Sequence, residues 1–154
     1  MDWFGNRYPT LEDLEGVALK QGAPVLYGPC EAPAAAWDDL GPLCIFIPGY
    51  RGRLAKCWGI SHELGHIVLG HGPLPHSNAN HEFEADKWAA QALIPEARIR
   101  AYRNATLSGF IKALLRHYAS EDEAVRMLAA RIAHARLAAI QDMQDNQDSN
   151  EEAV

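Results

Sequence analysis

The sequence lacks the apolar segments of membrane and secreted proteins. No apolar run approaches the ~18–20 residues of a membrane-spanning helix, and residues 1–7 show no basic segment followed by an apolar one, as a signal peptide would. Cysteine is scarce, since Cys30, Cys44 and Cys57 are odd in number and form no C-x-x-C pair. This pattern excludes a disulfide framework and indicates reduced thiols. We therefore expect a cytoplasmic protein that does not contact a membrane.

Positive charge is also in short supply. The 154 residues include 20 acidic and 14 basic side chains, which gives a formal net charge of −6. No Lys or Arg follows Arg136, whereas five acidic residues do: Asp142, Asp145, Asp148, Glu151 and Glu152. This balance argues against direct binding of nucleic acid, because the phosphates require a basic face. The composition of residues 142–154 also predicts a disordered acidic tail.

The remaining residues, 1–141, are expected to form one domain of the α+β class. A helix with Thr10 as its N-cap is predicted up to about Gly22. Short apolar runs at residues 25–27 and 43–47, bounded by Gly and Pro, are typical of strands in a small sheet. The apolar spacing then predicts helices over residues 53–70, 81–94, 96–102, 107–118 and from 120 onward. We expect a small N-terminal β-sheet packed on a mostly helical domain.

The run His62-Glu63-Leu64-Gly65-His66 matches the pattern H-E-x-x-H. Residues four apart lie on one face of a helix, so both imidazoles can reach one metal ion. Glu63 follows the first histidine directly, where its carboxylate can take a proton from a water activated by the metal. Zn²⁺ suits such a site best, since it accepts imidazole and carboxylate ligands and keeps an open position. Apolar flanking residues predict that this helix is buried, and buried histidines need partners.

A third metal ligand is expected from the next helix. Glu82 and Asp86 are four residues apart and share a helix face. Glu82 would complete the ligand set, and Asp86 would accept the second ring N–H of a ligating histidine. Glu84 is the alternative ligand, but it projects about 200° away from Glu82 around the helix, so only one of them faces the metal. We favour Glu82 because of its pairing with Asp86.

These motifs resemble those of the ImmA/IrrE family of zinc metallopeptidases. Members typically show H-E-L-G-H followed by E-x-E-A-[ND]-x-F-A-x-x-L-L-x-P, and the second motif here begins at Glu82 and ends at Pro95. The likeness covers roughly residues 43–136 and includes a late S-x-x-x-V helix, represented by Ser120, Ala124, Val125 and Arg131. Two positions depart from the pattern: Trp88 stands in place of Phe, and His71 lies five residues after His66, where the family often has a histidine four after.

The resemblance implies a zincin-like fold and a zinc-dependent endopeptidase. It implies an intracellular regulatory protease of phages, mobile elements or stress responses, whose protein partner is a helix-turn-helix repressor that it cleaves. Glu63 would be the catalytic base, and His62, His66 and Glu82 would hold the metal. The alternative is a non-catalytic zinc protein that regulates a repressor by binding it.

Four further residues are candidates for the cleft. Tyr50 and Arg51 precede the metal helix and can polarise a scissile carbonyl, while His71 and His76 can stabilise the oxyanion formed during peptide hydrolysis. Each can equally be an ordinary turn or loop residue. Cys57 is rejected as a ligand, because its position five residues before His62 points it away from the His62/His66 face.

Overall fold

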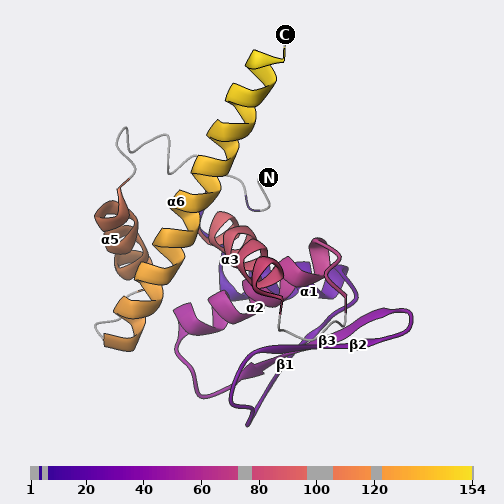
Figure 1. Cartoon of the computed structure of the whole chain (residues 1–154). Coiled ribbons are helices and arrows are strands. Elements are labelled where there is room, and N and C mark those ends of the chain that lie inside the picture. The colour runs from indigo at the N-terminus through magenta and orange to yellow at the C-terminus, as the bar shows by residue number, and fades with distance from the viewer. Residues whose placement is uncertain (1–3, 5–6, 73–77, 97–105, 119–122, 154) are drawn as a thin grey trace.

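The computed structural model describes residues 4, 7–72, 78–96, 106–118 and 123–153. Along the chain, helix α1 (Leu11–Lys20) precedes a small sheet, and the rest is helical (Figure 1). The sheet consists of β1 (Val25–Gly28), β2 (Ala34–Asp38) and β3 (Gly41–Pro48). It is followed by α2 (Arg53–Val68), α3 (Ala79–Leu93), α5 (Leu107–Tyr118) and α6 (Glu123–Glu152). The predicted α+β fold is confirmed, and its likeness to zincins stays a prediction.

Helix α1 begins where the sequence predicts. The Thr10 hydroxyl accepts a hydrogen bond from the backbone N–H of Asp13, and the Asp13 carboxylate accepts one from the backbone N–H of Thr10. This reciprocal capping box satisfies two donors that a helix start otherwise leaves unpaired. Arg7 forms an ion pair with the same carboxylate.

Strand β3 lies in the centre of the sheet, in the order β1-β3-β2. It pairs in parallel with β1, placing Val25 opposite Ile45, and antiparallel with β2, placing Ala35 opposite Ile45. Ile45 and Ile47 on β3 are fully buried and face the helical layer, because side chains alternate along a strand. Strand β2 is not predicted from the sequence, because its three alanines carry little strand propensity.

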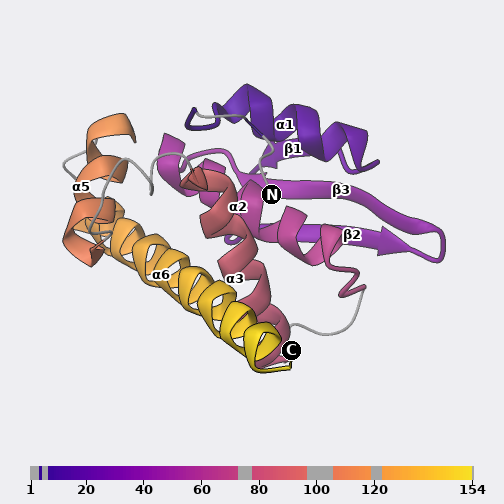
Figure 2. The same cartoon turned by 90° about the horizontal axis from the view of Figure 1, so that it is seen from above.

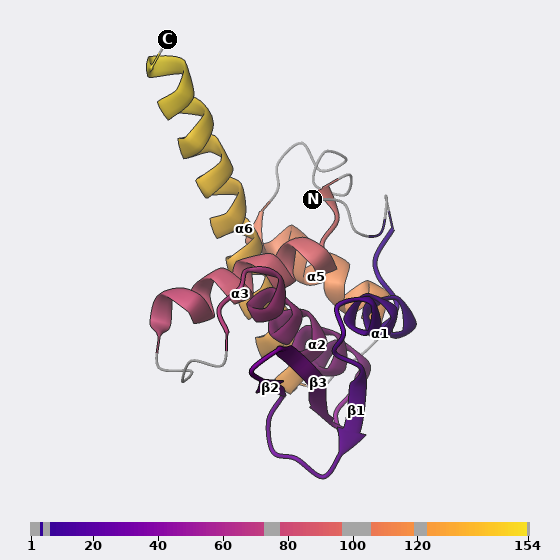
Figure 3. The ribbon, with the colours of Figure 1, turned by 90° about the vertical axis from the view of Figure 1, so that its right-hand side faces the viewer.

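Helix α2 occupies the middle of the molecule. It contacts the sheet through β2 and β3, and it contacts α1, α3 and α6. Figure 3 shows the sheet below α2 and the helices α3 and α6 above it. Leu54, Cys57, Ile60 and Leu64 of α2 are almost completely buried, so this helix is fixed on several sides. The site residues on α2 are therefore held on a rigid element.

Helix α6 runs alongside α3 (Figure 2) and also contacts α5. Its first half buries Ala129, Ile132 and Ala133, whereas residues 141–153 are exposed and extend beyond the body (Figure 1). The structure thus differs from the predicted disordered tail, because the helix continues to Glu152. Once a helix is nucleated by its packed half, each added residue costs little. A hydrogen bond from Gln141 to Asp145 and the ion pair between Lys87 and Asp142 stabilise this part of the helix.

Two sequence expectations fall partly or wholly outside the described residues. The helix predicted over 96–102 lies almost entirely in the undescribed segment 97–105, and the start of the last helix at Ser120 lies in the undescribed segment 119–122. Within the described part of the chain, no helix is long and apolar enough to span a membrane. The three cysteines are all free.

Candidate metal centre

The two helices that carry the predicted ligands pack against each other. His62 and His66 lie one turn apart on α2, and Glu82 lies in the first turn of α3. The Asn78 side chain caps α3 by accepting hydrogen bonds from the backbone N–H groups of Asn80 and His81. The helix start that positions Glu82 is thereby fixed by a local sequence signal.

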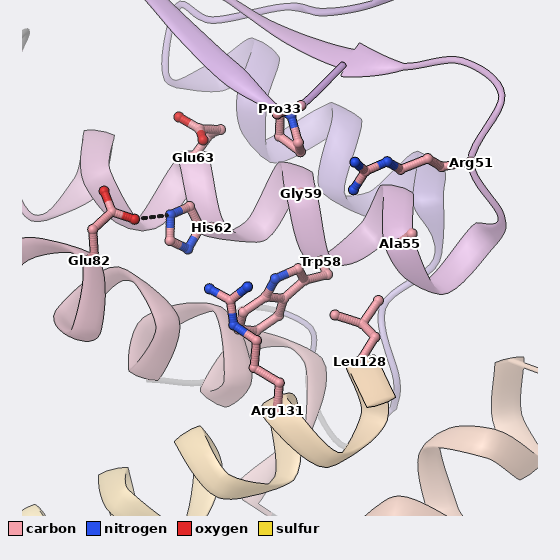
Figure 4. Close-up of a pocket in the computed structure, with 11 residues that line it drawn as sticks. Pro33, Arg51, Ala55, Trp58, Gly59, His62, Glu63, Glu82, Leu128 and Arg131 are labelled. Carbon is pink, nitrogen blue, oxygen red and sulfur yellow. Dashed lines mark hydrogen bonds and ion pairs between the residues drawn. The ribbon is translucent and has the colours of Figure 1, made fainter. Parts of the chain in front are cut away.

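Three polar groups from these helices converge on one point. The Nε2 atom of His62 lies 3.0 Å from Oε2 of Glu82, and Nε2 of His66 lies 3.1 Å from Oε1. The two Nε2 atoms are 3.1 Å apart. One ligand atom from each residue lies within 4.8 Å of the others. Figure 4 shows Glu82 pointing from α3 toward His62.

The second nitrogen of His62 is held by a carboxylate. Its Nδ1 lies 2.8 Å from Asp86, and the Arg131 guanidinium contacts both oxygens of Asp86 at 3.0 Å. Burial raises the pKa of Asp86, but the hydrogen bond with His62 and the charge of Arg131 outweigh it, so the pKa lies below its ordinary value. Asp86 is therefore ionised and accepts the Nδ1–H of His62. This is the pairing that the four-residue spacing predicts.

The other alternative, Glu84, lies outside this group. Its carboxylate is 2.9 Å from Nε2 of His71, and Nδ1 of His71 is 2.9 Å from Nδ1 of His66. Glu84 thus sits at the far side of the histidine pair, as expected for a side chain on another face of α3. The structure brings Glu82, and not Glu84, to His62 and His66.

The hydrogen-bond partners of His62 indicate what the site can hold. With the hydrogen of neutral His62 on Nδ1, its Nε2 presents a lone pair to the Glu82 carboxylate, which can only accept. Burial lowers the pKa of His62, but the hydrogen bond and charge of Asp86, with Glu63 and Glu82, raise it above its ordinary value. Two acceptors 3.0 Å apart need a proton or a cation between them. Two imidazoles and one carboxylate therefore fit a metal ion.

Glu63 lies beside this group at the wall of a cavity. This residue is only 3% exposed, and it follows His62 on α2. The cavity has a volume of about 550 Å³ and opens onto His62, Glu63 and Glu82 (Figure 4). Its remaining lining is mainly apolar with two cationic groups: Ala32, Pro33, Ala55, Trp58, Gly59, Leu128, Arg51 and Arg131. A buried carboxylate, a possible metal site and a cavity thus occur together.

The weaker candidates divide between the cavity and its surroundings. Arg51 lines the cavity and donates a hydrogen bond of 2.9 Å to the carbonyl of Glu31. Tyr50 is 72% exposed and is not among the lining residues. His71 lies behind His66 instead of in the cleft, and His76 lies outside the described residues.

Cys57 is buried in the core and is not part of the ligand group. Burial raises the pKa of its thiol to about 12, which disfavours the thiolate.

Sequence reasoning missed the contribution of α6 to the site. Arg131 is 5.3 Å from the ring centroid of Trp58 and holds Asp86, and Leu128 lines the cavity. Arg131 belongs to the late helix that resembles the family, but nothing in that motif indicates its contact with Asp86. The contact depends on how α6 packs across α3, which local patterns do not predict.

The comparisons with known proteins agree with this geometry. The family model described as the IrrE N-terminal-like domain of peptidase family M78 matches residues 31–109, which is just over half of the chain. The matched segment contains β2, β3, α2 and α3 and therefore every residue of the ligand group. Neither the curated proteins nor the solved structures gave a match. The chain therefore belongs to the ImmA/IrrE family, a family of peptidases.

Proposed function

We propose that the protein is a zinc-dependent endopeptidase. The observation that carries this proposal is the convergence of His62, His66 and Glu82 beside the buried Glu63 at the wall of a cavity. Catalytic zinc sites use three protein ligands and keep one position open, whereas structural sites use four. Within the described part of the chain the ligand group has three members. This count supports a catalytic zinc.

The chain's own residues supply the remaining chemistry. A zinc ion provides a Lewis acid that activates water and polarises a carbonyl group. Glu63 then acts as the base, since its carboxylate takes the proton of the attacking water and passes it to the leaving amine. Asp86 and Arg131 orient His62 from outside the ligand group. The packed surroundings of α2 hold Glu63 in place while the proton moves.

The cavity suits a polypeptide substrate. Trp58, Leu128 and Pro33 offer an apolar surface, and Arg51 and Arg131 offer donors for carbonyl or carboxylate groups. Among the described residues Arg51 forms no ion pair. Its guanidinium donates a hydrogen bond to the backbone carbonyl of Glu31. A side chain next to the scissile bond would fill this space.

The substrate that we propose is a helix-turn-helix repressor, cleaved in the cytoplasm. Family membership supports a peptidase, and the resemblance to regulatory members supports a repressor as its target. The net charge of −6 argues against direct binding of DNA, so a link to transcription would run through a protein.

The test is a cleavage assay with the zinc-loaded protein and the helix-turn-helix repressor encoded nearest to its gene. Wild type should yield two repressor fragments by mass spectrometry. Glu63→Gln should bind one zinc ion per chain and cleave at least about a thousandfold more slowly, because the base is lost.

Glu12→Gln makes the same chemical change on the exposed face of α1 and should leave cleavage intact. Equal cleavage by Glu63→Gln and wild type would overturn the mechanism. Zinc binding with no cleavage by wild type would favour the non-catalytic alternative, in which the protein regulates a repressor by binding.

A further inference from the structure

His71 is buried and lies next to His66, one of the proposed metal ligands. Its side chain is 7% exposed, although it follows the end of α2. One ring nitrogen, Nδ1, lies 2.9 Å from Nδ1 of His66, and the other, Nε2, lies 2.9 Å from the Glu84 carboxylate. Its ring also stacks on that of His81, with centroids 4.1 Å apart and planes 4° from parallel.

The backbone brings His71 to this place. Leu69 ends α2, and Gly70 follows with a φ of +70°, a left-handed conformation that favours glycine. The backbone N–H of Gly70 donates to the carbonyl of Ile67, and that of His71 donates to the carbonyl of His66. These two bonds form a Schellman motif, in which the residue after the glycine commonly contacts the residue five positions before it. Here those two residues are His71 and His66.

The hydrogen bonds then fix where the protons lie. The Glu84 carboxylate only accepts, so Nε2 of His71 carries a hydrogen. In a neutral His71 the other nitrogen, Nδ1, is an acceptor. It can therefore only receive a hydrogen from Nδ1 of His66, which leaves the lone pair of His66 on Nε2. That atom is the one facing His62 and Glu82.

We propose that His71 and Glu84 form a second positioning arm of the metal centre. This inference rests on the proposed zinc site. His62 is oriented by Asp86 directly, whereas His66 is oriented by a histidine that is itself held by Glu84. The arm fixes the tautomer and the ring plane of His66. His71 does not line the cavity, so it is a positioning residue and not a catalytic one.

The experiment measures zinc affinity by competition with a chromogenic chelator. His71→Phe keeps the stacking on His81 but removes both hydrogen bonds, and Glu84→Ala removes only the end of the arm. Partners of this kind typically contribute about 10–100-fold in metal affinity, so we expect a loss of that size for both variants. Because the Glu84 side chain is 52% exposed, Glu84→Ala should fold even if His71→Phe does not.

His81→Phe is the matched control. It makes the same change in the same cluster, but among the described residues His81 contacts His71 only by stacking. Its zinc affinity should stay within about twofold of wild type, well inside the range expected for a lost partner. As a second readout, ¹⁵N–¹H spectra of zinc-loaded wild type should show a slowly exchanging Nδ1–H on His66, and this signal should be lost in His71→Phe.

The outcomes separate this inference from the proposed function. If wild type binds zinc and both variants bind it equally tightly with the His66 signal unchanged, the positioning arm is wrong while the zinc site stands. If wild type binds no zinc, both the arm and the proposed function are wrong.

Discussion

Gly65 on α2 lies against the backbone of Ala85 on α3. A Cβ atom at Gly65 would lie 3.0 Å from the carbonyl oxygen of Ala85 and 3.1 Å from its Cα. These are backbone atoms, so they cannot move aside as the end of a side chain can. The glycine inside H-E-x-x-H therefore sets how closely α3 approaches, and Glu82 lies one turn before Ala85 on that helix.

Replacing Gly65 with Ala should push the two helices apart. An alanine inside a helix gains roughly 1 kcal/mol in propensity, but forcing extra volume into a packed contact costs about 1–3 kcal/mol. We expect a net loss of about 1 kcal/mol in the free energy of unfolding, together with weaker zinc binding, because Glu82 moves with α3. Urea titration and chelator competition measure the two effects.

Gly16→Ala provides the control for that substitution. Gly16 lies inside α1, and a Cβ there would meet nothing within 4 Å. This variant should be more stable than wild type by roughly 0.5–1 kcal/mol, with unchanged zinc affinity. If Gly65→Ala and Gly16→Ala both stabilise the protein, the contact between Gly65 and Ala85 has room for a Cβ atom.

Removing the metal should lower the thermal stability. A ligand that binds only the folded state, at a free concentration of 100 times its Kd, stabilises that state by about 2.7 kcal/mol. For a chain of this length that corresponds to a Tm shift of about 5–10 °C, which differential scanning fluorimetry with and without a chelator would detect. Glu82→Gln should show no such shift, while Glu12→Gln should retain it. A shift of equal size in Glu82→Gln would exclude Glu82 as a ligand.

Asp86→Asn should weaken zinc binding without removing the site. The change takes away the charge that holds Nδ1 of His62 and pairs with Arg131, and we expect an affinity loss of about 10–100-fold. Asp39→Asn, at an exposed position in the turn before β3, should have no effect. Isothermal titration of the metal-free proteins with zinc makes the comparison, and equal affinities would argue against this role of Asp86.

Asp13 should make stability depend on pH in the acidic range. Hydrogen bonds from Arg7, opposed by burial and assisted by Thr10, hold the pKa of its carboxyl well below the ordinary value. The folded state thus favours the ionised form, so its contribution is complete above the unfolded pKa of ~3.9 and is lost as pH falls toward the folded value.

The variant Asp13→Asn isolates this charge because its amide oxygen can still accept from Thr10. It should be less stable than wild type at neutral pH, and the difference should shrink below about pH 4, near the ordinary pKa of Asp. The effect should be small because the pair with Arg7 is largely exposed and screened. Asp148→Asn, on the exposed end of α6, should show no such pH dependence. If the stability difference between Asp13→Asn and wild type does not change with pH, Asp13 is not the source of the pH dependence.

The parts of the fold that follow from local spacing could be predicted from the sequence. The helices carrying His62 and Glu82 have strong periodic patterns and clear ends, and the four-residue spacings of His62/His66 and Glu82/Asp86 place each pair on one face. Helix geometry predicts that Glu82 and Glu84 cannot both face the metal, and the preference for Glu82 rests on its pairing with Asp86. Those relationships need only the chain between residues 62 and 86.

Other features depend on contacts between distant segments or on an overlooked turn. Strand β2 forms by pairing with β3, although its alanines give no strand signal. Arg131 reaches Asp86 only because α6 packs on α3. His71, a candidate for the cleft, is directed back to His66 by the Schellman motif at Gly70.

The ligands come from both sides of the connection between α2 and α3, with His66 at the end of one helix and Glu82 at the start of the next. In the unfolded chain these residues are the ends of a flexible loop, and bringing them together costs conformational entropy. A metal ion shared by both helices would offset that cost in the way a disulfide does. The centre would then be a removable cross-link of the fold, and chelation would loosen the α2–α3 pair before the rest of the molecule.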